Sequence, residues 1–172
     1  LTQMGTSVER AECYTATRAQ LPAINEAIQR FARKNDRLPM PAARNIGIED
    51  INYGREALAA AITQAGGVSY GALPFQALGL PPSMAGDCWG NKFTYMVTTA
   101  LTTSAASGGY LDATVLGNIA RKSTAATTTD SAIAYAVVSH GMDQLGAVKL
   151  NYSAVSKGWC AAGAATLTNM NC

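Results

Sequence analysis

The sequence predicts an α+β fold in which a long N-terminal α-helix packs on a small antiparallel β-sheet. Two observations carry this prediction: an amphipathic segment fills the first 36 residues, and short strand-like segments fill the second half of the chain. At 172 residues the chain is long enough for one domain with a sizeable core, and no repeat or linker divides it. We expect a helix over 1–36, an αβ loop region over 37–86, and a sheet with a C-terminal loop over 87–172.

The predicted helix carries two apolar stripes that are out of phase. The stripes consist of Leu21, Ile24, Ile28 and Phe31, and of Leu1, Met4, Val8 and Ala11. Pro22 lies where they meet and predicts a kink or a restart, because proline removes one helical hydrogen bond. We expect the Leu21 stripe to face the sheet and the Leu1 stripe to face another partner.

A basic cluster ends the predicted helix. It consists of Arg30, Arg33, Lys34 and Arg37. A solvated helix end, where the dipole favours cations, is the simplest interpretation, and a contact with an acidic patch on a neighbouring molecule is the alternative. Pro39 and Pro41 stop the helix, because proline disfavours helical backbone in the preceding residue.

The loop region contains a predicted short helix and a group of apolar anchors. Strong helix formers predict a helix over Arg55–Gln64, ended by Gly66 and Gly67. The anchors that follow are Leu73, Phe75, Leu78 and Leu80, flanked by Pro74, Pro81 and Pro82. We interpret them as side chains that hold the helix on the sheet, not as a cofactor site.

About four strands are expected in the second half. Asp87–Asn91 predicts a turn in which Asp87 accepts backbone N–H groups, Gly90 takes a positive φ and Trp89 buries its ring. The predicted segments after it are a strand over Lys92–Thr98, a strand or short helix over Ala113–Ala120, a strand over Ile133–Ser139 and its partner over Ala147–Tyr152. Gly146 marks the hairpin between the last two.

The amino-acid composition argues against some classes of function for this chain. Charged residues make up only 14% of the chain and the net charge is +2, which argues against binding to nucleic acid or membranes by long-range attraction. Thirteen of the 34 residues from Thr98 to Ser131 are Ser or Thr, which suits a secreted protein or one packed against neighbours. The sequence contains no apolar run of the length that a membrane span needs.

Four cysteines, at positions 13, 88, 160 and 172, allow three disulfide pairings. Their spacing fits no zinc pattern, and His140 is the only histidine. We therefore favour an extracytoplasmic domain stabilised by disulfides over a cytosolic domain with buried thiols.

Four strings in a fixed order give the chain a family resemblance. They are RLPMPA (Arg37–Ala42), GALPFQALGL (Gly71–Leu80), GDCWGNKFTYMV (Gly86–Val97) and VVSHG (Val137–Gly141). Together they resemble the globular part of type IV pilin-like proteins, the family of pilins, minor pilins and type II secretion pseudopilins. The positions that match its motifs are Leu38, Pro39, Pro41, Leu73, Pro74, Phe75, Asp87, Trp89, Gly90, Asn91, Ser139, His140 and Gly141. Phe75 stands where the family usually has tryptophan, and the C-terminal end lacks the family's longer acidic and apolar tail.

The resemblance implies a structural role and further details. A short C-terminal loop closed by Cys160 and Cys172 would leave Cys13 to pair with Cys88. The implied partners are other pilin or pseudopilin subunits, and the inner membrane through an apolar helical half upstream of Leu1, with a prepilin-peptidase motif before it. The implied location is an extracellular pilus on a bacterial cell surface, after anchoring in the inner membrane.

The sequence offers little for catalysis or metal binding. Ser139 and His140 are neighbours on a predicted strand, so their side chains should point opposite ways, and no nucleophile elbow or phosphate-binding loop accompanies them. We expect no enzyme and no cofactor. Calcium remains an open alternative through Asp112, Asp130 and Asp143, although calcium needs six to eight oxygen ligands.

Three functions are therefore compared. The first is a filament subunit, and the second is a binding module of the same fold at a filament tip, engaging surfaces, DNA or secreted cargo through its polar loops. The third is a small extracytoplasmic hydrolase, suggested only by Ser139 and His140.

Overall fold

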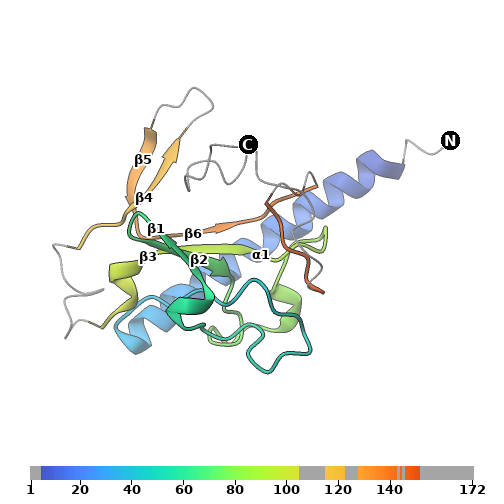
Figure 1. The fold of residues 1–172 in the computed structure, drawn as a ribbon. Helices are drawn as coiled ribbons and strands as arrows, with labels where there is room; N and C mark the ends of the chain where they lie inside the picture. Colours follow the sequence, from blue (N-terminus) through green and yellow to red (C-terminus); the bar gives the residue numbers. More distant parts are fainter. Residues whose placement is uncertain (1–4, 105–114, 123–127, 143, 145, 152–172) are drawn as a thin grey trace.

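The computed structural model describes residues 5–104, 115–122, 128–142, 144 and 146–151. One long helix, α1 (Gly5–Asn35), lies along a four-stranded antiparallel sheet whose strand order is β1-β2-β3-β6 (Figure 1). A two-stranded hairpin, β4-β5, projects from the end of this sheet. The predicted α+β class, with a helix on a small antiparallel sheet, is confirmed.

Helix α1 continues through Pro22 without a restart. Ile24 and Ile28 are fully buried against the sheet, and Leu21 and Phe31 are partly buried beside them, as the first stripe predicted. The helix ends at Asn35, and Asp36 then takes a positive φ of 52° that turns the chain toward the buried Leu38.

The main sheet consists of β1 (Thr63–Ala65), β2 (Val68–Ala72), β3 (Thr94–Thr98) and β6 (Tyr135–Val138). The hairpin consists of β4 (Ile119–Lys122) and β5 (Thr128–Ile133). The described residues also form three short 3-10 helices: η1 (Ala59–Ala61) before β1, η2 (Pro82–Met84) between β2 and β3, and η3 (Thr99–Thr102) directly after β3.

The helix predicted over Arg55–Gln64 is wrong. Only Ala59–Ala61 is helical, as a 3-10 turn, and Thr63–Ala65 forms the edge strand β1. Gly66 and Gly67, read as a helix stop, instead make a two-residue hairpin turn with φ values of 58° and 75° that pairs Ala65 with Val68. Two glycines with positive φ match the right-handed twist of a hairpin, and this outweighs the helix propensity of the alanines.

The structure also differs from the strand predictions for three later segments. Ile133–Ser139 is divided, because Ile133 ends β5 while Tyr135 begins β6, so the chain changes sheets at Ala134. Residues 147–150 do not pair with β6 as predicted. They pair with the Asp87 turn, where Lys92 N donates to Val148 O (2.8 Å) and Leu150 N donates to Gly90 O (3.0 Å). In the segment predicted over Ala113–Ala120, the described part enters a strand only at Ile119.

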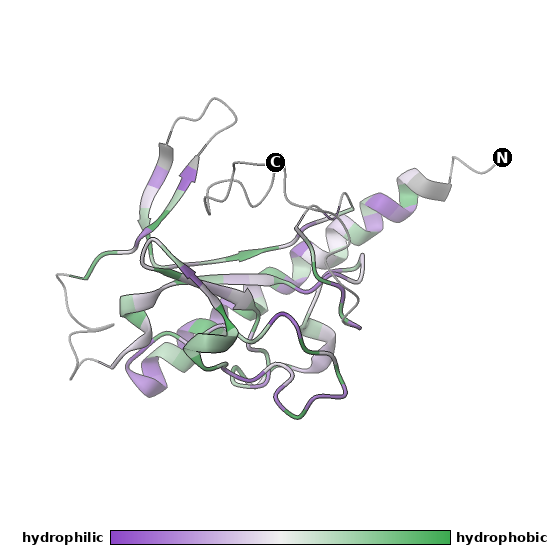
Figure 2. Ribbon diagram, in the orientation of Figure 1, coloured by the Kyte–Doolittle hydropathy of each residue, from purple (hydrophilic) through white to green (hydrophobic). Residues whose placement is uncertain are grey.

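Both faces of β3 are buried, so the polar residues that flank this strand in the sequence also lie deep in the molecule. Tyr95 and Val97 join Ile24 and Ile28 of α1 in the larger core. Met96 faces the other way and packs with Val68 and Ile119, so the base of the hairpin covers the second face. In Figure 2 the strand β6, which pairs with β3, is coloured mainly as hydrophobic.

Candidate functional site

The structure brings two sequence motifs together around Asp87. Its Oδ1 accepts the N–H groups of Trp89 (3.1 Å) and Asn91 (2.9 Å). Its Oδ2 accepts the Ser139 hydroxyl (2.7 Å) and the Asn91 side-chain amide (3.3 Å). Asp87 is buried, and four donors satisfy a carboxylate whose burial without partners would be strongly unfavourable. The Asp87–Asn91 turn is thereby fixed to the strand end that carries Ser139.

Asn91 connects this turn to the last described segment. Its amide donates to Gly141 O (3.0 Å), and its Oδ1 accepts the ammonium of Lys149 (3.0 Å). Lys149 also donates to Trp89 O (3.2 Å). Asn91 has no exposed surface, and Gly90 has the predicted positive φ, at 76°. The network therefore joins the Asp87–Asn91 turn to Gly141 and Lys149, which are 50 and 58 positions from Asn91 in the sequence.

Ser139 and His140 do not form a nucleophile and its base. The single hydroxyl proton of Ser139 goes to Asp87, whereas His140 Nε2 lies 2.7 Å from Thr94 Oγ1. His140 is buried directly after β6, in the strand-end position that the sequence predicted. The Ser139 hydroxyl is therefore held by Asp87 and not by His140.

The predicted loop anchors and proline turn lie in the main core. Leu38, Leu73 and Phe75 are buried there together with residues of α1. Pro39, Pro41 and Pro74 are buried too, and Phe75 packs edge-on against Tyr53 at 5.3 Å between ring centroids. These positions hold the αβ loop region against the helix and sheet.

A buried lysine beneath the αβ loop was not predicted from the sequence. Lys92 is 3% exposed, and its ammonium donates to Arg44 O (3.0 Å) and to Ile46 O while lying 5.2 Å from the centre of the Tyr53 ring. Burial, together with the charge of Arg44, lowers the pKa of Lys92 to about 8. Arg44 itself donates to Gly146 O (2.7 Å), and burial lowers its pKa. The sequence predicts Lys92 only as the first residue of a strand, and its burial results from the loop folding over it.

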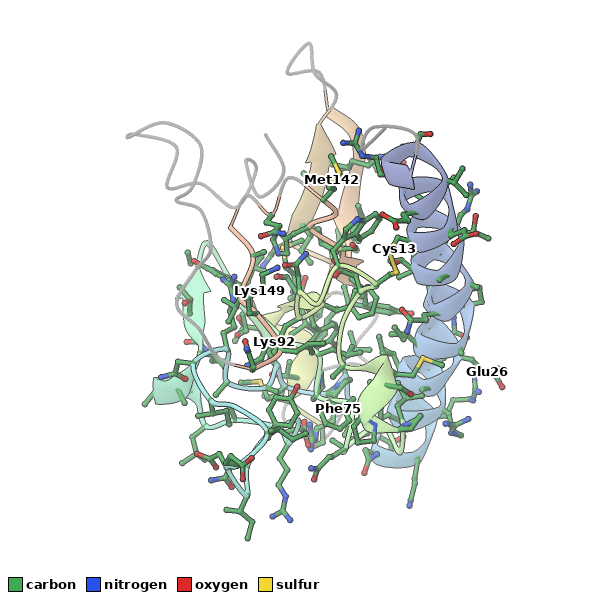
Figure 3. The ribbon with its side chains drawn as sticks, turned by 90° about the vertical axis from the view of Figure 1, so that its right-hand side faces the viewer. Cys13, Glu26, Phe75, Lys92, Met142 and Lys149 are labelled. Carbon is green, nitrogen blue, oxygen red and sulfur yellow. A yellow bond between two sulfur atoms is a disulfide. The ribbon has the colours of Figure 1, made fainter. Side chains whose placement is uncertain are left out.

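A disulfide connects the helix to the Asp87 turn. Cys13 is bonded to Cys88, with 5.1 Å between the Cα atoms, and Figure 3 shows Cys13 on the side of α1 that faces the sheet. Beside the bond, Cys88 N donates to Thr17 Oγ1 (3.1 Å), and Tyr14 packs edge-on against Trp89 at 5.5 Å. Trp89 is only half-buried, because its ring packs on the exposed Tyr14 and not in the core as predicted. Cys160 and Cys172 lie outside the described residues.

The N-terminal half of α1 beyond this disulfide presents an exposed face. It extends past the sheet (Figure 1), with Val8 59% and Tyr14 69% exposed. A shallow hollow on it is lined by Ser7, Val8, Ala11, Glu12, Thr15 and Ala16. Val8 and Ala11 belong to the predicted second stripe, and Leu1 and Met4 lie outside the described residues.

The calcium alternative gains no site from the part of the chain that the structure describes. No group of three His, Cys, Asp or Glu side chains suited to a metal is found there. Asp130 pairs with Arg121 at 2.8 Å across the β4-β5 hairpin, and Asp112 and Asp143 lie outside the described residues. Among the described helices, none is both long and apolar enough to cross a membrane.

Comparisons with protein-family models, curated proteins and solved structures find no match to this chain.

Proposed function

We propose that this chain is the globular domain of a subunit of a type IV pilus-like filament: a pilin, minor pilin or pseudopilin. The observation that carries the proposal is the division of α1 into two halves. Around Ile24 and Ile28 the helix is buried in the domain's own core, whereas around Val8 and Ala11 it presents a partly apolar surface on which Val8 is exposed. One half of such a helix packs in the core of its own domain, and the other half stays available for contacts. This arrangement is suited to packing against other subunits in a filament.

The disulfide supports this division. An exposed half-helix of roughly four turns is only marginally stable by itself. The Cys13–Cys88 bond and the Tyr14–Trp89 contact fix its orientation on the domain. A pre-oriented surface loses less conformational entropy when it binds a neighbour. A disulfide also fits assembly outside the cytoplasm, at a bacterial cell surface, because thiols stay reduced inside.

The polar network supports a structural role over the hydrolase alternative. Every oxygen of Asp87 accepts hydrogen bonds, and the Ser139 proton is donated to it. Asp87, Asn91 and Ser139, three of the positions that match the family motifs, therefore hold a turn, a strand end and a C-terminal segment together. We propose no catalytic activity and no cofactor.

The binding-module alternative has one observation in its favour. The β4-β5 hairpin projects away from the main sheet (Figure 1), and its Arg121 and Asp130 are exposed. A projecting polar hairpin suits contact with a surface or cargo when a subunit sits at a filament tip. Abundance separates the alternatives, since a shaft subunit dominates sheared filaments and a tip subunit is present in traces.

The experiment that tests the proposal compares Val8→Glu with the matched control Leu116→Glu in the full-length gene. Both positions are exposed, at 59% and 68%, so neither change should alter the melting temperature of the isolated domain. Sheared filaments should be lost with Val8→Glu and kept with Leu116→Glu. Filaments unaffected by Val8→Glu, or no filaments from the unaltered gene, would count against the proposal.

A further inference from the structure

Two exposed isoleucines flank two carboxylates at the end of the αβ loop. The segment Ile48–Ile51, here called the tip, has the sequence Ile-Glu-Asp-Ile, and all four residues are exposed. Ile48 is 65% and Ile51 75% exposed, so both large apolar side chains lie mostly in water. Neighbouring apolar side chains that remain in water indicate a contact surface.

The tip is held in a defined place. Asp50 Oδ1 accepts Asn52 N (2.8 Å), and Tyr53 N donates to Asp50 O (2.9 Å), so the turn is closed by the Asp50 side chain together with the backbone. On one side Lys92 binds the carbonyls of Arg44 and Ile46, and on the other side Tyr53 is buried against Phe75. Figure 3 shows Lys92 and Phe75 inside the molecule next to this loop. A surface fixed from below is pre-organised for binding.

A basic surface lies at the end of α1. Arg30, Arg33 and Lys34 are exposed and follow helical spacing of three and four residues, so they share one face. The two ion pairs of the described residues are Arg37–Glu56 and Arg121–Asp130, and neither involves these three cations or the tip carboxylates. The aliphatic stems of the cations offer apolar area that isoleucines could cover.

The two surfaces lie at one end of the molecule but on different sides. Figure 3 shows α1 along one side, with Glu26 pointing outward, and the αβ loop low on the opposite side. In Figure 1 both the C-terminal end of α1 and this loop lie away from the N-terminus. Two surfaces on opposite sides of a molecule cannot contact each other within one copy. They also cannot pair reciprocally in a closed dimer. A contact between them therefore joins each copy to a further copy.

We propose that the tip of one copy docks on the Arg30–Arg33–Lys34 face of the next copy, with Glu49 and Asp50 opposite the cations and Ile48 and Ile51 on their stems. Charge complementarity selects a second copy, because one contact neutralises both surfaces. Nucleic acid would match the basic face and leave the acidic, apolar tip without a partner. This inference rests on the proposed filament function and names the lateral contact within it.

The test uses charge reversal and rescue in the full-length gene. Glu49→Lys with Asp50→Lys, and separately Arg30→Glu with Arg33→Glu and Lys34→Glu, should each lower sheared filament yield about tenfold or more, because like charges then face each other. Combining all five changes in one chain should restore the yield to within about twofold, because the pairing is re-formed with opposite signs. Arg121→Glu, which makes the same kind of change outside both surfaces, is the control.

A second readout separates this inference from the proposed function. The purified 172-residue chain should self-associate at low salt in sedimentation velocity, dissociate as salt is added, and follow the same loss and rescue. Salt-dependent association with this pattern, but no filaments in cells, would support the contact and refute the filament function. Filaments that ignore both reversals would overturn the contact alone. Retention of the wild-type chain on duplex DNA without self-association would also overturn the contact.

Discussion

Ser139 donates its hydroxyl proton to Oδ2 of Asp87 over 2.7 Å, although the two residues are 52 positions apart in the sequence. This bond joins the turn before β3 to the end of β6, and β3 pairs directly with β6. It therefore fixes the end of the strand pair at the place where the C-terminal segment arrives. The hydrogen-bond network around Asp87 should therefore stabilise the fold, and a substitution at Ser139 tests this.

Ser139→Ala should lower the free energy of unfolding by about 1–3 kcal/mol, because a buried carboxylate loses one of its donors. Urea denaturation measures the change. Ser104→Ala, at an exposed position, is the control and should change stability by less than about 0.5 kcal/mol. Equal effects of the two substitutions would show that the network adds no stability.

The two halves of α1 should differ in their effect on the isolated domain. Ile28→Ala should destabilise it by about 2–5 kcal/mol, because Ile28 is fully buried and its truncation leaves a cavity. Val8→Ala should cost less than about 0.5 kcal/mol, because Val8 is largely exposed. Thermal unfolding of both variants measures this, and comparable losses would place the N-terminal half in the domain's own core.

Removal of the Cys13–Cys88 bond should loosen the N-terminal half of α1 more than its C-terminal half. The bond closes a loop with a sequence separation of 75, and loss of a native disulfide typically lowers stability by about 2–5 kcal/mol. In Cys13→Ser with Cys88→Ser, amide exchange should accelerate most before residue 17 and least around Ile28. A uniform acceleration along α1 would contradict a local role for the bond.

The number of free thiols in the unaltered chain tests both expected disulfides. We expect no free thiols in the denatured, unreduced protein, which includes the prediction that Cys160 and Cys172 are paired. A thiol reagent added under denaturing conditions counts them directly. About two reactive thiols per chain would retain Cys13–Cys88 and refute the second pair, and about four would refute both.

Lys92 should make stability rise with pH in an alkaline window. Its pKa is about 8 in the folded chain and about 10.4 in an unfolded one, so between these values the unfolded state binds more protons. The free energy of unfolding therefore increases with pH from about 8 toward 10, by up to about 2 kcal/mol. The neutral amine still has two N–H groups for the carbonyls of Arg44 and Ile46.

Lys92→Met is the comparison for this pH dependence. It removes the titrating group while keeping an unbranched side chain of similar length. Urea denaturation at pH 7, 8, 9 and 9.5 should show wild type gaining stability relative to the variant above pH 8. The series stops there because burial raises the pKa of Tyr95, and ionisation of tyrosine in the unfolded chain opposes the trend above about pH 10. A constant difference over the series would show that Lys92 titrates normally.

The sequence predicted those features that depend on local pattern. The inward stripe of α1 and the core-facing side of β3 follow from spacing alone, and the Asp87 turn follows from its residue types. The hairpin at Gly66 and Gly67 was misread, since two glycines after a run of helix formers also describe a helix end. The change of sheets at Ala134 and the burial of Lys92 depend on segments distant in sequence, and no local pattern encodes such contacts.

The anchor beneath the αβ loop has a consequence for how this surface can evolve. Lys92 binds main-chain oxygens of Arg44 and Ile46, and every amino acid supplies such an oxygen. All four side chains from Ile48 to Ile51 are exposed, and only that of Asp50 helps to close the turn, by accepting Asn52 N. Substitutions at Ile48, Glu49 and Ile51 therefore leave the Lys92 attachment intact. Related chains could therefore exchange these exposed side chains without redesigning the domain that carries them.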